Sequence, residues 1–181
     1  MLYFCINRSV VIMFIAHLPT GYLLAKLLRK KTQQHLSWKT LLICGLMGSI
    51  FPDIDLIYFY LIDARQNNHH SYISHIPFYY LTLYLFVSVL FLITGNKRNL
   101  MISSVFMLGV LLHLILDTVA GGIIWYYPIY EQYVTLSVVK EKYNWWVLNF
   151  ILHWSFVLEL VIIIFSLFVY RRSRKVKLIA R

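Results

Sequence analysis

Histidine and aspartate side chains lie within or beside the apolar runs of this sequence, where ionisable groups are rare. The stretch "NNHHSYISHI", residues 67–76, holds three of the seven histidines. A charge near the centre of a bilayer costs at least about 2.5–3.5 kcal/mol, so carboxylates kept there need a compensating partner, and a metal cation is one candidate. The candidate site residues are His17, Asp53, Asp55, His70, His75, His113 and Asp117.

The spacing of the aspartates indicates how they are presented. His113 and Asp117 are four residues apart and share one helix face, which suits two metal ligands or a ligand with its orienting carboxylate. Asp53 and Asp55 are two apart and point away from each other on a regular helix. Pro52 precedes them and removes a backbone donor, which predicts a kink or break. A broken helix at membrane depth is tolerated where it lines a cavity.

The other ionisable residues have less regular spacing. His70 and His75 are five apart and converge if His70 lies in a loop that enters the helix and His75 lies in its first turn. His69 is a weaker candidate than His70. His153 and Glu159 are six apart in the last apolar run and do not share a helix face, so we place them outside the core site.

The composition predicts an integral membrane protein. Hydrophobic residues make up 60% of the 181 residues and charged residues 13%, with a mean hydropathy of +0.69. Each apolar segment has about 20 residues, enough to cross a bilayer as a helix. We expect an all-α polytopic membrane helix bundle, a single integral membrane domain over residues 1–181, with one helix broken at Pro52. The roughly five expected transmembrane helices cover residues 9–28, 40–62, 72–94, 99–120 and 145–170.

Basic residues are unevenly distributed along the chain, whose formal net charge is +10. Thirteen of the 17 Lys and Arg fall in residues 26–39, the turn 95–99 and the tail after residue 170. The positive-inside rule then predicts a multi-pass membrane protein with its N-terminus outside and its basic tail, 171–181, in the cytoplasm. This pattern favours contact with membrane lipid and argues against a nucleic-acid partner. It places the candidates on the outer side, with His17 about 12 Å into its span.

The segment 121–143, "GGIIWYYPIYEQYVTLSVVKEKY", is too polar and too broken by glycine and Pro128 to span a membrane. Its tryptophan and tyrosines favour the membrane–water interface. We therefore expect an interfacial loop on the outer side, and a lid over the site is the alternative.

Four motifs, "AHLPTGYLLA", "FPDID", "HHSYISH" and "HLILDTVAGGIIWYYP", resemble in order and spacing the bacterial YdjM-like family. Its members are inner-membrane proteins described as predicted metal-dependent hydrolases, and the resemblance covers about residues 14–128. The chain departs from the family pattern at Ser71, where the family has an Arg suited to clamp a phosphate, and at Ile76, where it has a Ser. The family's motif residues fall on His17, Pro52, Asp53, Asp55, His70, His75, His113 and Asp117.

The residue types and the resemblance together favour a membrane metal-dependent hydrolase with one or two divalent ions in an outward-facing site. A ligand set of imidazole and carboxylate suits Zn, Mn or Fe without separating them. Likeness to the metal cluster of zinc-dependent phospholipases C indicates phosphoester chemistry by analogy, and the depth in the membrane favours a lipid-linked substrate. The expected metal ligands are His17, Asp53, His70, His113 and Asp117, while Asp55 and His75 are expected to bind a second metal or to act as the general base.

Two other functions stay open from the residues alone. A small ion or proton transport component would use the same ionisable residues, with Glu159 extending the path inward, although the polar groups gather on one side. A non-catalytic membrane protein that retains a structural metal site is compatible with the departure at Ser71. The sequence does not determine the substrate, the metal or the oligomeric state.

Overall fold

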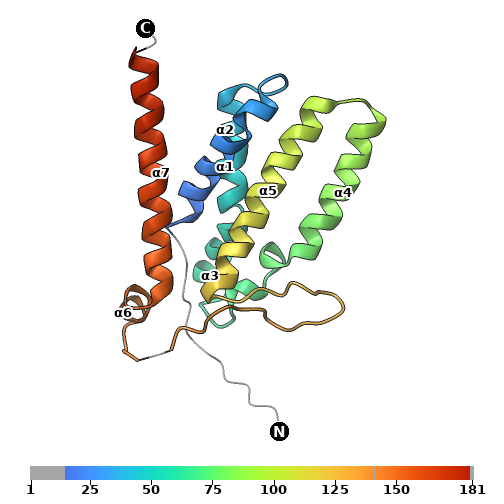
Figure 1. Cartoon of the computed structure of the whole chain (residues 1–181). Helices are drawn as coiled ribbons and strands as arrows, with labels where there is room; N and C mark the ends of the chain where they lie inside the picture. The colour runs from blue at the N-terminus through green and yellow to red at the C-terminus, as the bar shows by residue number, and fades with distance from the viewer. Residues whose placement is uncertain (1–14, 141, 180–181) are drawn as a thin grey trace.

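The structure, a computed structural model, describes residues 15–140 and 142–179 and is all-helical, as expected (Figure 1). Within these residues an isolated antiparallel bridge joins Ile123 and Val134. The α-helices are α1 (His17–Thr32), α2 (Trp38–Ile50), α3 (Leu56–Leu61), α4 (Pro77–Ile93), α5 (Lys97–Ala120), α6 (Trp146–Ile151) and α7 (Trp154–Ile179). Three short 3-10 helices lie between them, namely η1 (Pro52–Asp55), η2 (His69–Ser71) and η3 (Ile73–His75).

Local sequence explains where the helices begin. The Ser37 hydroxyl accepts a hydrogen bond from the backbone of Thr40 at 3.1 Å and so caps α2. Asn96 caps α5 in the same way, with its side-chain oxygen 3.0 Å from the backbone nitrogen of Asn99. Pro77 opens α4 at the first helical position, where its missing N–H has no partner to lose.

Helices α1, α2 and α5 pack closely because glycines stand where they cross. A Cβ at Gly48 of α2 would lie 2.2 Å from the backbone oxygen of Phe106 on α5. A Cβ at Gly21 of α1 would lie 2.6 Å from the backbone oxygen of Gly45 on α2. Small residues at crossings are typical of helices that associate in membranes. The close approach brings the end of α2 against the second half of α5, where His113 and Asp117 lie.

The predicted break at Pro52 is confirmed. Helix α2 ends at Ile50, η1 begins with Pro52, and the segment Pro52–Leu61 is bent by 51° from α2. The break places Asp53 and Asp55 in a 3-10 turn, where they no longer point to opposite sides of a regular helix.

Judged by length and composition, fewer of the described helices could cross a membrane than the sequence predicts. Helix α5 and residues Trp154–Arg174 of α7 are each long and apolar enough to cross a membrane. The bent pair Trp38–Ile50 and Pro52–Leu61 makes a third span if it counts as one, and α4 is apolar but only 17 residues long. The count of about five therefore stays a prediction, as do the sides on which the termini lie.

Two helix starts differ from the predicted ones. Ile15 and Ala16 form a bend and α1 begins at His17, so His17 does not lie two turns into a helix. Pro19 explains this start, because proline fits only the first turn of a helix. Helix α4 begins at Pro77, five residues late, because Pro77 forces Ile76 into an extended conformation (φ −97°, ψ 110°). Residues 9–14 of the first predicted span lie outside the described residues.

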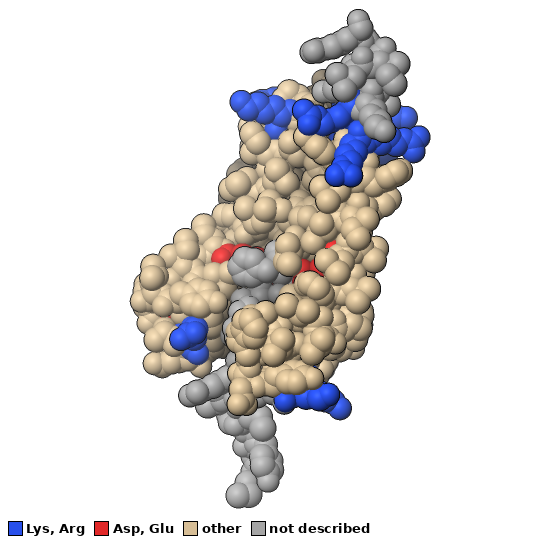
Figure 2. All heavy atoms as spheres, turned by 90° about the vertical axis from the view of Figure 1, so that its left-hand side faces the viewer, with Lys and Arg blue, Asp and Glu red and all other residues tan. Residues whose placement is uncertain are grey.

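The two outer helices, α4 against α5 and α7 against α1, flank the central group (Figure 1). Many of their apolar side chains are exposed, as in Phe86 and Ile164, which suits contact with lipid. The turn between α1 and α2 lies at the same end of the molecule as the end of α7 (Figure 1). On the face of the molecule where α7 lies, Lys and Arg side chains are concentrated at that end (Figure 2).

Candidate metal centre

The seven candidate residues come together at the end of the bundle opposite the crowded basic residues, where five elements meet. His17 opens α1, Asp53 and Asp55 lie in η1, and the other four come from η2, η3 and α5. Asp53 is partly exposed, and the other six are buried. The structure thus brings every residue of the predicted site into one cluster.

Asp117 lies at the middle of this cluster. Its Oδ1 is 3.2 Å from Nε2 of His17. Its Oδ2 is 3.0 Å from Nε2 of His113, 3.6 Å from Nε2 of His75 and 3.8 Å from Nε2 of His70. One carboxylate therefore faces four imidazoles from four different elements.

Asp53 closes the cluster from the broken helix. Its Oδ1 is 3.6 Å from Nε2 of His113 and 3.8 Å from Nε2 of His75. The two histidine nitrogens are themselves 3.4 Å apart. His17 stacks on His113 with ring centroids 3.9 Å apart, which holds both rings in place.

The outer hydrogen bonds of the histidines decide which ring nitrogen carries the proton. His75 Nδ1 lies 2.7 Å from Oδ2 of Asp55, and His113 Nδ1 lies 2.8 Å from the backbone oxygen of Ser49 near the end of α2. A carboxylate or carbonyl oxygen accepts, so in both rings Nδ1 carries the hydrogen. When such a ring is neutral, it presents Nε2 to the centre as an acceptor.

His70 is oriented in the same way, by a backbone oxygen of the segment that follows α5. Its Nδ1 donates to the backbone oxygen of Gly122 at 3.2 Å, so its Nε2 also faces the centre without a hydrogen. In metal sites a histidine ligand is oriented in this way by an oxygen that binds its other ring nitrogen.

Nε2 of His75 and Nε2 of His113 lie 3.4 Å apart, and each is 3.0 to 3.8 Å from Oδ1 of Asp53 and from Oδ2 of Asp117. Acceptors at such distances repel unless a cation lies between them. Ligand atoms about 2.0–2.2 Å from one ion are roughly 3.2–3.6 Å apart in a tetrahedral site. The cluster thus has both the donor types and the spacing to hold a metal ion.

Unsatisfied polar atoms support the same conclusion. Oδ2 of Asp117 and both ring nitrogens of His17 are buried and form no hydrogen bond among the described residues. An unsatisfied buried polar group costs about 1–3 kcal/mol, more when charged. Three overlapping groups of buried or half-buried ligand atoms could hold an ion, namely His69, His70 and His75; His17, Asp53 and His113; and His75, His113 and Asp117.

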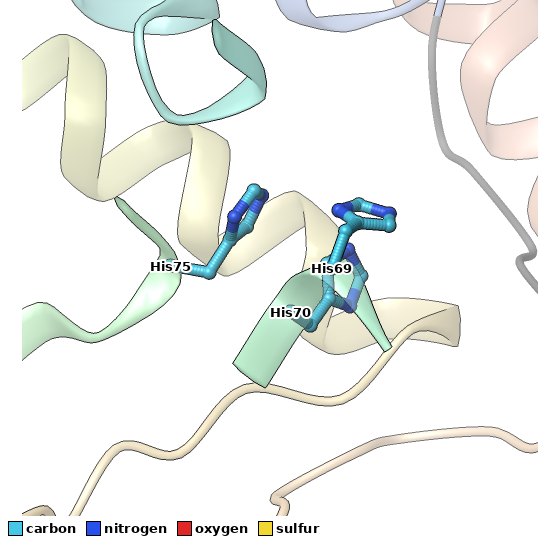
Figure 3. A group of neighbouring side chains, drawn as sticks. All are labelled: His69, His70 and His75. Atoms are coloured by element: carbon cyan, nitrogen blue, oxygen red, sulfur yellow. The ribbon is translucent and has the colours of Figure 1, made fainter. Parts of the chain in front are cut away.

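His69 belongs to the cluster, although its sequence context made it a weaker candidate. Its ring lies 4.1 Å from that of His70 and 5.0 Å from that of His75, between centroids (Figure 3). Burial lowers the pKa of His69 to about 2 and lowers the pKa of His75, so both rings are neutral at physiological pH. Adjacency to His70 was the available signal. The 3-10 turn, capped by Asn68, turns both rings inward.

The segment 121–143 forms one wall of the centre. Its Gly122 carbonyl accepts the hydrogen bond from His70, and a Cβ at Gly121 would lie 2.1 Å from Cε1 of the His70 ring. The segment returns to α5 through a hydrogen bond from the Leu136 backbone to the Thr118 carbonyl at 2.8 Å. It therefore contacts the site directly, whichever side of the membrane it faces.

Glu159 and His153, the two ionisable residues of the last predicted span that were set apart from the site, lie outside the cluster. Glu159 of α7 is buried and accepts a hydrogen bond from the backbone of Ile15 at 3.1 Å, just before α1. His153 lies between α6 and α7, 2.8 Å from the hydroxyl of Ser155 and 3.1 Å from that of Ser137. Glu159 holds α7 to the start of α1, and His153 joins the start of α7 to the preceding loop.

The comparisons with known proteins give one match. A model of the family described as YdjM inner membrane protein matches residues 12–177. No curated protein and no solved structure matches the chain.

Proposed function

The chain belongs to the YdjM inner membrane protein family, and from this premise we propose that it is a metal-dependent hydrolase of the membrane. One observation carries the proposal: Nε2 of His75, Nε2 of His113 and Oδ2 of Asp117 lie 3.0 to 3.6 Å from one another in a buried cluster. Apart from a protonated ring, such a cluster is stable only around a cation. Its ligands are imidazole and carboxylate, which suit Zn, Mn or Fe.

A divalent ion at this centre supplies a Lewis acid that activates water and polarises a phosphoryl oxygen. The protein's own residues orient the reacting groups. Asp55 receives hydrogen bonds from Nδ1 of His75 and from the hydroxyl of Ser74 through one oxygen, Oδ2. Its other oxygen, Oδ1, is buried and has no hydrogen-bond partner among the described residues. Asp55 therefore fixes His75 with one oxygen and has the other available as the general base.

A groove of about 740 Å³ beside the centre supports a lipid-linked substrate. Asp55 is the member of the metal centre that lines it, and aromatic and aliphatic side chains from the broken helix, the turns and α4 form its walls: Phe51, Tyr58, Tyr72, Tyr80 and Leu83. Such a groove accommodates an acyl or polyprenyl chain next to the reacting group. Ser71, at the position of the family's Arg, also lines it.

The first test is the metal content of the protein purified in detergent. We expect about one or two ions per wild-type chain and loss of that metal in the double variant His113→Ala/Asp117→Ala. The matched control is His35→Ala, which removes an exposed histidine from the turn between α1 and α2. A wild-type protein without metal, or a double variant that keeps it, would contradict the proposal.

The second test separates catalysis from a purely structural metal site. The metal-loaded protein is incubated with a panel of phospholipids and polyprenyl phosphates, and release of phosphate or headgroup is measured. Hydrolysis that disappears in the His113→Ala/Asp117→Ala variant supports an enzyme. Stoichiometric metal without hydrolysis of any panel member would instead support a structural role.

A further inference from the structure

A second groove lies at the opposite end of the molecule, between α1 and α7. It has a volume of about 570 Å³. The end of the molecule where it lies is crowded with Lys and Arg (Figure 2). Its lining divides into a polar and an apolar part: Lys26, Arg29, Arg172 and Ser173 form the first, and Phe165, Phe168 and Val169 the second.

The polar part holds cations close together in fixed positions. Lys26 donates to the hydroxyl of Ser173 at 2.9 Å, which joins α1 to α7. The ring of Trp38 lies 4.8 Å from the Lys26 nitrogen and 5.3 Å from the Arg29 guanidinium carbon. Contacts of this kind orient a cation over an aromatic face. Trp38 therefore keeps two positive charges side by side, although they repel each other.

The two arginines of the polar part have no carboxylate partner in the described part of the chain. No Asp or Glu lines the groove, and no carboxylate of the described residues lies within ion-pair distance of Arg29 or Arg172. Arginine guanidinium groups bind phosphate through paired hydrogen bonds. The polar part is thus complementary to a phosphate or a similar anion.

The apolar part identifies what carries the anion. Phe165 and Phe168 precede Arg172 by seven and four residues, so all three lie along one face of α7. Arg172 is close to the end of the candidate span Trp154–Arg174, and the two phenyl rings lie roughly 6–10 Å deeper along the helix. Both rings are more than half exposed. A soluble anion would occupy only the polar part, whereas a phospholipid also places an acyl chain against these rings.

We propose that this groove is a binding site for an anionic phospholipid. The phosphate lies between Lys26, Arg29 and Arg172, and an acyl chain follows α7 along Phe165 and Phe168. Basic pockets between transmembrane helices bind anionic headgroups in this way. The site is independent of the metal centre, so it stands or falls separately from the hydrolase.

The test is binding of phosphatidylglycerol to the full chain in detergent, followed by native mass spectrometry against phosphatidylcholine with the same acyl chains. Wild type is expected to retain one phosphatidylglycerol in preference to phosphatidylcholine. The variant Arg29→Gln/Arg172→Gln is expected to bind phosphatidylglycerol at least about tenfold more weakly. The matched control Lys97→Gln/Arg98→Gln removes the same charge from the exposed first turn of α5, outside the groove, and is expected to bind as wild type does.

Further measurements keep the result unambiguous. The melting temperatures of the two double variants should agree, since all four side chains are exposed. Phe165→Ala/Phe168→Ala should weaken lipid binding, and soluble glycerol phosphate should not displace the lipid. Equal binding by the two charge variants, equal affinity for both lipids, or displacement by glycerol phosphate would overturn the proposal.

Discussion

Asp117 is a buried carboxylate whose neighbours, when neutral, do not offset the free-energy cost of burying its charge. It lies within 3.8 Å of four histidine nitrogens and forms no hydrogen bond through Oδ2 among the described residues. A lone carboxylate in this position would be expensive to bury, and neutral imidazole acceptors do not relieve that cost. At the scale of single residues the carboxylate therefore needs a positive charge beside it, which a protonated imidazole or the proposed metal would supply.

Asp55 has a different role that a conservative substitution can isolate. Asn at this position can still accept the hydrogen from His75 Nδ1, but it lacks the negative charge. We expect Asp55→Asn to bind metal about 10–100-fold more weakly. At saturating metal it should still hydrolyse substrate about 10²–10⁴-fold more slowly, because the general base is lost. Metal titration and turnover at saturating metal measure the two effects separately.

Ser74→Ala is the control for this substitution, since it removes only the second hydrogen bond to Asp55 Oδ2. Unchanged turnover of Asp55→Asn at saturating metal would exclude Asp55 as the base and leave it as an orienting group for His75.

At the scale of elements, the crossing of α2 and α5 positions His113. The helix break leaves the last carbonyls of α2 without partners in that helix, and the one at Ser49 accepts from His113 Nδ1. This contact depends on the close approach at Gly48, whose Cβ would clash with the Phe106 carbonyl. The same packing thus serves the fold and the metal centre.

We expect Gly48→Ala to lower both stability and metal affinity. Forcing a methyl group against backbone costs about 1–3 kcal/mol and separates α2 from α5, which moves Ser49 away from His113. Thermal unfolding in detergent and metal titration measure the two changes. Ile43→Ala, which trims a half-exposed side chain on the same helix, should leave metal affinity unchanged. A stable Gly48→Ala protein with wild-type affinity would contradict this role of the crossing.

The wall made by segment 121–143 can be tested at Gly121. A methyl group there would overlap the His70 ring, which can turn away because it is a side chain, so the fold should survive. Gly121→Ala is therefore expected to lose metal affinity with little change in melting temperature. Ile129→Ala in the exposed part of the same segment is the comparison. Equal metal affinity in the two variants would show that His70 is not needed at the centre.

At the scale of the whole molecule, two sites occupy opposite ends. The metal centre gathers histidines and aspartates where the broken helix and the turns meet, and the lipid groove gathers Lys and Arg where α1 and α7 end. This separation keeps the acidic cluster away from the basic end, so neither charge neutralises the other.

Metal removal should affect the stability of the entire molecule because the centre joins five elements. We expect chelation to lower the melting temperature and re-addition of metal to restore it, since an ion present at 100 times its dissociation constant stabilises the folded state by about 2.7 kcal/mol. Differential scanning fluorimetry in detergent checks this. The His113→Ala/Asp117→Ala variant should melt at one temperature with and without chelator. A wild-type melting temperature that ignores chelator would argue against the centre.

The sequence by itself determined much of the chemistry. Hydropathy predicted an all-helical membrane protein, because apolar runs must satisfy their own backbone in lipid. The i,i+4 spacing of His113 and Asp117 and the break at Pro52 follow from local geometry, and both are found as expected. The membership of His17 and His70 in one cluster agrees with the resemblance to the family.

The tertiary structure alone decided what depends on contacts between distant segments. The orientation of His113 comes from Ser49, 64 residues away, and that of His70 from Gly122, 52 residues away. Local periodicity carries no information about such partners. His69 could not be ranked from its position, because adjacent residues diverge on a helix. Only the folded structure shows that its ring lies 4.1 Å from that of His70, between centroids. The pairing of α1 with α7, and with it the lipid groove, likewise arises only when the helices pack.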